Sequence, residues 1–177
     1  MAVPVVTLPR NFDGPTLSRV ADDVIAHAQN GKWPPRLQID FSKLNFIRPP
    51  GVVFLSNLLH WLGSKGSTVE LINCDPNKPA ISYLDDSLFF EQHCGETLRD
   101  NASPRSTTRP LLKISQKESH AWLETNFVPW LAARLSITEA SLYAIKVCVS
   151  ELFNNIQDHT RYDIGSIFIQ HFPNEKR

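Results

Sequence analysis

The chain lacks an excess of charge of either sign. Among its 177 residues, 18 lysines and arginines balance 18 aspartates and glutamates. General binders of nucleic acid or of membrane surfaces usually carry a basic surplus, because released counterions drive their binding. We therefore expect neither nucleic acid nor a membrane as a partner. The sequence also has no run of 18 or more apolar residues, so no membrane-spanning helix is expected.

Cysteine and glycine are scarce as well. The three cysteines, Cys74, Cys94 and Cys148, are odd in number and far apart, which fits neither a disulfide framework nor a zinc site. The seven glycines form no phosphate-binding P-loop and no nucleophile elbow. Residues 1–10 have no basic segment followed by an apolar one, so no secretory leader is visible. These features together predict a protein of the reducing cytoplasm.

Short apolar strands alternate with helical patterns in the first half. The predicted strands are residues 3–8, 37–41 and 69–74, and the predicted helices begin near Pro15, at residues 49–52 and at Pro79. The third of these helices is expected to run without a break to His93. Strands separated by helices of ten to fifteen residues imply crossovers and a largely parallel sheet. The fold class is therefore α/β.

The α/β pattern stops after Cys94 and begins again near Leu111. Residues 101–110 are polar and contain two prolines, and such a stretch is uncommon inside a compact domain. We interpret residues 1–95 as one domain, 96–110 as a linker and 111–177 as a second domain. A long surface loop of a single domain is the alternative.

The second half predicts a strand, two helices and a strand. They cover residues 111–115, 119–135, 136–159 and 164–172, and Pro129 predicts a kink in the first helix. Ser136 and Glu139 have the spacing of a capping box at the start of the long helix. Its predicted apolar face comprises Leu142, Ile145, Val149, Leu152, Phe153 and Ile156. Residues 173–174, Pro-Asn, indicate a hairpin turn whose returning strand is missing, so we expect that this second half is incomplete.

One motif in the first half lies between a buried strand and a helix start. Strand 37–41 is followed by a polar turn, by Phe46-Ile47, and by Gly51 at the start of an apolar helix. This arrangement resembles a STAS domain, the fold of anti-anti-sigma factors and of the cytoplasmic part of anion transporters. In phosphorylatable members a serine or threonine precedes the glycine, but here Pro50 stands there. Proline has no hydroxyl and no N–H, so the resemblance implies a constitutive surface for docking a protein partner.

A second motif lies near the end of the long helix. Glu151, Asn155 and His159 are four residues apart, which places them on one face in successive turns. An amide oxygen is a suitable neutral ligand for Mg²⁺, and a carboxylate one turn away can accept a proton. The alternative is a simple helix end, because asparagine, aspartate and histidine commonly terminate helices.

The run from Glu151 to His159 resembles the N-box of the GHKL superfamily, which includes histidine kinases, anti-sigma kinases and type II topoisomerases. The matching pattern is Glu-Leu-x-x-Asn-x-x-x-His. The resemblance implies a histidine-kinase-like α/β sandwich that binds ATP and Mg²⁺. Asn155 would hold the metal, Glu151 would act as the catalytic base, and His159 and Asp158 would border the phosphates.

The sequence departs from that superfamily beyond the motif. Its adenine-binding Asp-x-Gly-x-Gly segment and its glycine-rich lid are absent from these 177 residues. A lost hydrogen bond to a charged group costs about 1.5–3 kcal/mol, so we do not expect this chain alone to bind nucleotide tightly.

These two motifs lead to one functional hypothesis and one alternative. The hypothesis is a regulatory signalling protein in which a STAS-like docking module is coupled to a GHKL-type Mg-ATP-binding domain. In a longer protein that domain would be an ATPase or a kinase of serine or threonine. The alternative is a non-enzymatic module for protein interaction and homodimerisation with a degenerate ATPase half, because an incomplete sheet edge can recruit another strand.

Overall fold

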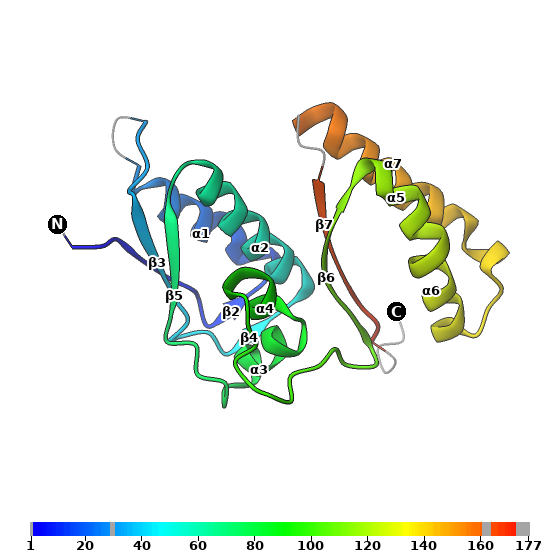
Figure 1. Ribbon diagram of the computed structural model, residues 1–177, viewed down its shortest axis with the longest axis horizontal. Coiled ribbons are helices and arrows are strands. Elements are labelled where there is room, and N and C mark those ends of the chain that lie inside the picture. The colour runs from blue at the N-terminus through cyan, green and yellow to red at the C-terminus, as the bar shows by residue number, and fades with distance from the viewer. Residues whose placement is uncertain (1, 29–30, 161–163, 173–177) are drawn as a thin grey trace. The chain divides into compact units, whose positions relative to one another are not determined.

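The computed structural model describes residues 2–28, 31–160 and 164–172 (Figure 1). They form two compact units. The first contains the residues up to Leu111 together with Phe168–Phe172, and the second extends from Leu112 to Ile167. Each contains helices and strands, which confirms the mixed α/β class at this coarse level.

A parallel sheet in the order β1-β3-β5 lies at the centre of the first unit. Its strands are Val5–Thr7, Arg36–Asp40 and Thr68–Ile72. Helices α1 (Gly14–Ile25) and α2 (Pro49–Ser64) connect them and lie on the same side of β3 and β5 (Figure 1). The parallel sheet predicted from the sequence is confirmed.

The core of the first unit lies between this sheet and its helices. Alternate residues of the central strand, Leu37 and Ile39, are fully buried, whereas Gln38 and Asp40 on the other face are partly exposed. This alternation follows from the period of two along a strand. The helices contribute Val20, Val24, Val52, Leu55 and Leu62.

The predicted helix from Pro79 to His93 is wrong, because the structure has two helices there. Helix α3 is Pro79–Asp86 and helix α4 is Phe89–Cys94. Leu88 between them has φ +59°, in the left-handed region that interrupts a helix. The Ser87 carbonyl accepts a hydrogen bond from the Leu111 N–H at 3.2 Å. That contact with a residue far along the chain was not visible in the sequence.

The residues predicted to be a linker, 96–110, contact helix α3 within the first unit. The Asp85 carboxylate, fully buried, accepts hydrogen bonds from the Leu98 N–H at 2.8 Å and from the Arg99 N–H and Nε at 3.1 Å. Arg105 pairs with Asp86 at 2.9 Å. The boundary between the compact units therefore differs from the predicted domain boundary near residue 95.

Two strands and a series of helices form the remainder of the chain. They are β6 (Thr108–Ser115), α5 (Gln116–Trp122), a π-helical turn (Leu123–Phe127), α6 (Val128–Leu135), a 3-10 turn (Glu139–Leu142), α7 (Tyr143–Thr160) and β7 (Ile164–Gln170). Strands β6 and β7 pair with each other. The His171 N–H at the end of β7 donates to the Thr107 carbonyl at the start of β6, so the pair is antiparallel.

The kink or break predicted at Pro129 coincides with a change of helix type in an uninterrupted helical segment. A π-helical turn ends at Phe127, directly before the helix that contains Pro129 in its first turn. Proline lacks an N–H and its ring crowds the carbonyl four residues earlier, which explains the change in helical hydrogen bonding at this point.

The predicted capping box at Ser136 is wrong. Ser136 has φ +54° and ends helix α6, so its side chain caps nothing that follows. Thr138 instead precedes the 3-10 turn, and its hydroxyl lies 2.9 Å from that of Ser141. The long helix α7 therefore begins only at Tyr143.

Candidate functional site

Helix α7, which carries the N-box-like motif, is held to its unit by one side. Leu142, just before the helix, and Phe153 within it are 1% and 3% exposed. Gly165 of β7 lets the helix approach closely, because a Cβ at this position would lie 3.1 Å from Ile156 Cδ1 and 3.2 Å from Phe153 Cε1. The side of α7 that carries Phe153 therefore faces β7.

Glu151 and Asn155 lie on the opposite side of α7. Both side chains are exposed, and neither makes a hydrogen bond or ion pair with any residue that the structure describes. Asp158 is exposed as well. His159 belongs to α7, but its side chain lies outside the described part of the chain, so its predicted role stays a prediction. The structure thus brings the acid and the amide together on one open helix face.

The predicted apolar stripe of α7 is only partly buried. Leu142 and Phe153 are buried as expected, but Ile145 is 42% exposed and Leu152 is 61% exposed. Tyr143 and Val147 are also exposed. Ile145 and Leu152 lie to one side of Asn155 on the helical wheel, since they are ten and three residues before it at 100° per residue. The exposed face of α7 is therefore apolar as well as polar.

Other polar residues of α7 differ from Glu151 and Asn155 because they form hydrogen bonds with side chains of neighbouring helical segments. The Asn154 Oδ1 accepts a hydrogen bond from Gln116 Nε2 of α5 at 3.3 Å. Lys146 Nζ donates to Glu124 Oε1 at 2.6 Å, and this bond holds the pKa of the Glu124 carboxyl below its usual value. Adjacent asparagines thus differ, because one joins two helices and the other faces solvent.

The donor set on α7 fits a hydrated magnesium ion bound through phosphates. Mg²⁺ commonly takes one or two protein ligands and keeps several waters, so the amide oxygen of Asn155 is sufficient and the Glu151 carboxylate remains available to accept a proton. Over residues 2–28, 31–160 and 164–172, no group of three or more histidines, cysteines, aspartates or glutamates is placed to hold a metal ion by itself.

The STAS-like motif of the first unit is built around Gly51. Strands β2 (Asn11–Phe12) and β4 (Phe46–Ile47) pair in parallel directly before α2. A Cβ on Gly51 would lie 2.7 Å from the Phe12 carbonyl oxygen, so only glycine allows α2 to begin this close to β2. Pro49 and Pro50 form the first turn of α2, and Arg48 before them provides no side-chain cap.

Sequence analysis missed a polar cluster at the carboxyl end of the sheet. The Asp40 carboxylate accepts hydrogen bonds from Asn73 Nδ2 at 2.7 Å, from the Ser42 N–H at 2.8 Å and from the Ser42 hydroxyl at 2.7 Å. Burial raises the pKa of Asp40, but these hydrogen bonds outweigh it and the net pKa is lowered. Asn73 has φ +58° and follows β5. The feature of the sequence that could have indicated this cluster is an aspartate at the end of an alternating strand.

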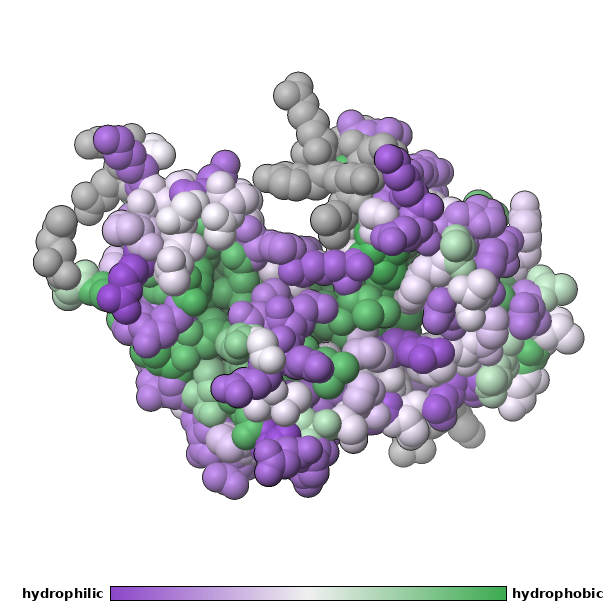
Figure 2. Space-filling view, in the orientation of Figure 1, coloured by the Kyte–Doolittle hydropathy of each residue, from purple (hydrophilic) through white to green (hydrophobic). Residues whose placement is uncertain are grey.

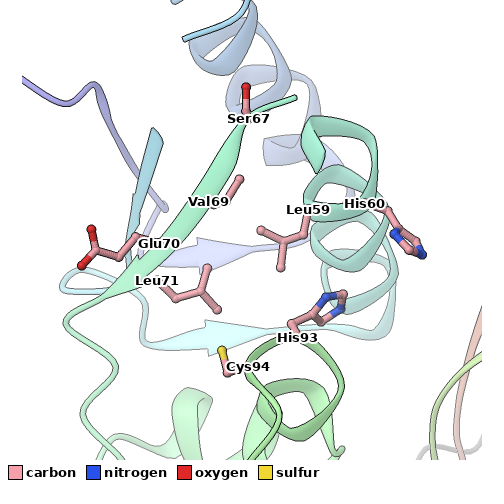
Figure 3. A pocket seen from close by; sticks show the side chains of 8 residues that line it. All are labelled: Leu59, His60, Ser67, Val69, Glu70, Leu71, His93 and Cys94. Atoms are coloured by element: carbon pink, nitrogen blue, oxygen red, sulfur yellow. The ribbon is translucent and has the colours of Figure 1, made fainter. Parts of the chain in front are cut away.

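A groove of about 390 Å³ lies beside strand β5 (Figure 3). Val69 and Leu71 of β5 and Leu59 of α2 face it, and His93 and Cys94 border it from α4. Hydrophobic surface is visible where these elements lie in the space-filling view (Figure 2). The groove follows a sheet edge, and His60, Ser67 and Glu70 line it beside the apolar side chains.

Comparison with protein-family models, with curated proteins and with solved structures gives no match. None of the helices in the described part of the chain has the length and apolar character that crossing a membrane requires. Function must therefore be argued from the residues themselves.

Proposed function

We propose that this chain is a regulatory signalling protein in which a STAS-like docking module acts together with a GHKL-type Mg-ATP-binding unit. The observation that carries the proposal is the pair formed by Glu151 and Asn155. Both lie one turn apart on the exposed side of α7, and both lack partners among the described residues. Side chains that stabilise a fold are usually paired or buried, whereas these are available to a ligand.

Each side chain of the pair has a distinct role in this proposal. Asn155 supplies an amide oxygen to Mg²⁺, which neutralises charge on the ATP phosphates when it is bound. Glu151 accepts a proton, either from a serine or threonine hydroxyl in a kinase reaction or from water in hydrolysis. Asp158 and His159 border the phosphates at the end of the helix.

The docking role of the first unit is proposed from its motif. Pro50 stands where the STAS family places its phosphorylated residue, and proline cannot be phosphorylated. The first unit therefore presents its surface to a protein partner at all times.

The nucleotide role is tested by a titration that detects weak binding. Mg·ATP at millimolar concentration is added to the full chain, and backbone and side-chain amide NMR signals are followed. The proposal expects shifts along α7 that need Mg²⁺ and that disappear in Asn155→Ala. Asn154→Ala is the matched control, since it removes the same group from the adjacent residue and should keep the shifts. Absence of shifts in α7, or equal shifts in both variants, would refute the nucleotide site.

The apolar part of the exposed α7 face favours a second function. Tyr143, Ile145, Val147 and Leu152 are all more than 40% exposed, and a cluster of exposed apolar side chains is typical of an interaction site. In this alternative, α7 joins two copies of the chain. Sedimentation equilibrium of the wild type and of Leu152→Ser distinguishes the two: a dimer that the substitution dissociates supports the alternative, and a monomer in both cases rejects it.

A further inference from the structure

A groove of about 580 Å³ runs along strand β1 within the first unit. One wall is residues 5–10, which comprise β1 and the segment after it. The other wall is one face of α1, with Arg19 and Asp23 four residues apart, and His27 just after the helix. Lys43, which follows β3, completes the lining. This groove lies on the opposite edge of the sheet from the groove beside β5.

The β1 wall is a sheet edge with backbone groups suited to pairing. In the parallel register of β1 with β3, the Gln38 N–H donates to the Pro4 carbonyl at 2.9 Å and the Leu8 N–H donates to the Asp40 carbonyl at 3.0 Å. Even-numbered residues of β1 thus direct their backbone groups to β3. Val5 and Thr7 direct theirs outward, because successive residues of a strand alternate. Such an edge can accept another strand.

The groove is lined by cations that lack partners. The side chains of Arg10, Arg19 and Lys43 are exposed and make no ion pair or hydrogen bond with any described residue. Asp23 is the single carboxylate in the lining. Because the whole chain has no net charge, this is a local excess of positive charge.

Three arginines elsewhere in the first unit are ion-paired, unlike the cations of the groove. Arg36, Arg99 and Arg105 each form an ion pair with a carboxylate of the same unit. The cations along the groove differ from these arginines in having no carboxylate partner among the described residues, and their positive potential attracts an anionic ligand.

We propose that this groove binds an extended acidic segment of a partner protein. The segment adds to the free edge of β1 through the backbone groups of Val5 and Thr7, and its acidic side chains pair with Arg10, Arg19 and Lys43. The inference rests on the proposed docking role of the first unit and names its surface and the chemistry of its partner. Pro4 and Pro9, which have no N–H, bound the pairing edge, so the added strand is short.

The probe for this surface is a fluorescein-labelled heptapeptide, Glu-Glu-Val-Thr-Val-Glu-Glu, titrated onto the full chain and followed by fluorescence anisotropy. Binding is expected to weaken as salt is raised, since exposed charge pairs are screened. The double variant Arg19→Glu/Lys43→Glu should bind at least about tenfold more weakly, because each reversal removes one attraction and adds one repulsion. Lys117→Glu, at an exposed lysine of the second unit, should bind like the wild type.

Strand addition is tested separately from charge attraction. A peptide with proline in place of its central threonine and of the valine that follows keeps its charge but loses a backbone N–H on each of its edges, and it should bind at least about tenfold more weakly. In saturated complex, amide exchange of Val5 and Thr7 should slow. Equal binding of the proline peptide, unchanged exchange, or equal binding by the charge-reversed variant would overturn the proposal. Displacement of the peptide by millimolar inorganic phosphate would identify a small-anion site and would also overturn it.

The nucleotide titration separates the failure of this inference from the failure of the proposed function. If Mg·ATP shifts α7 but the acidic peptide does not bind, the edge surface is rejected and the nucleotide role is retained. If the peptide binds as expected and Mg·ATP has no effect, the docking surface is supported and the nucleotide role is rejected.

Discussion

Replacement of Gly51 by alanine tests whether the close approach of α2 to β2 determines the stability of the first unit. Helix propensity alone predicts a gain of up to about 1 kcal/mol, because alanine favours a helix over glycine. The structure predicts the opposite. The new Cβ would lie 2.7 Å from the Phe12 carbonyl oxygen, although real Cβ contacts are essentially never shorter than 3.0 Å.

The magnitude follows from what has to move. The contacted atom is backbone, and the Phe12 carbonyl also accepts a hydrogen bond from the Arg48 N–H at 3.1 Å. Overpacking of this kind costs about 1–3 kcal/mol, and weakening that hydrogen bond adds about 0.5–1.5 kcal/mol. After subtraction of the gain in propensity, we expect Gly51→Ala to lower the free energy of unfolding by about 1–3 kcal/mol.

Gly63→Ala is the matched control. Gly63 lies in the same helix, and a Cβ there would meet nothing within 4 Å. This substitution should leave the free energy of unfolding unchanged or raise it by up to about 1 kcal/mol.

The assay is urea denaturation followed by tryptophan fluorescence. Trp33 and Trp61 pack edge to face in the first unit with ring centroids 4.7 Å apart. In a Trp122→Phe/Trp130→Phe background the signal reports that unit alone. If both glycine substitutions shift the urea midpoint in the same direction, the steric argument is refuted.

Two further predictions concern the buried carboxylate of Asp85 and the partly buried thiol of Cys74. Asp85→Ala should lower the free energy of unfolding by about 3–5 kcal/mol, because it removes a fully buried carboxylate that accepts three hydrogen bonds, from the Leu98 N–H and from the Arg99 N–H and Nε, and leaves Arg99 paired with Asp86 alone. Arg105→Ala, which removes an exposed pair, should cost at most about 1 kcal/mol by the same denaturation assay. Burial raises the pKa of Cys74 to about 12, so iodoacetamide at pH 8 should modify exposed Cys148 well before Cys74, as read by peptide mass mapping. Equal rates of labelling at Cys74 and Cys148 would contradict this difference in reactivity. The raised pKa of Cys74 also stabilises the fold below the ordinary thiol pKa, and this contribution to the free energy of unfolding should decline as the pH rises from about 9 toward 12.

Much of the first unit was predictable because local signals agreed with tertiary structure. Alternation in residues 37–41 matched a strand with one buried face, and Pro49-Pro50 matched the first turn of α2. The break at Leu88 was not predictable. There Leu88 adopts a left-handed backbone conformation and the Ser87 carbonyl accepts a hydrogen bond from the distant Leu111 N–H, and local periodicity indicates neither feature.

The candidate site on α7 was likewise predictable from the sequence in one respect and not in another. The spacing of Glu151 and Asn155 in the sequence is sufficient to predict that they share one helix face, since helical periodicity is local. Their exposure was not determined by spacing. It follows from the side of α7 on which Phe153 packs, which the close approach at Gly165 permits.

The sequence by itself determined the parallel sheet, the helices between its strands, and the residues that share a helix face, because these depend on periodicity and on proline over a few neighbouring residues. Only the tertiary structure decided that Ile145 and Leu152 face solvent, that Asp40 accepts hydrogen bonds from both Ser42 and Asn73, and that unpaired cations line the edge of β1. Those features depend on contacts between residues far apart in the chain, and such contacts leave no periodic mark in the sequence.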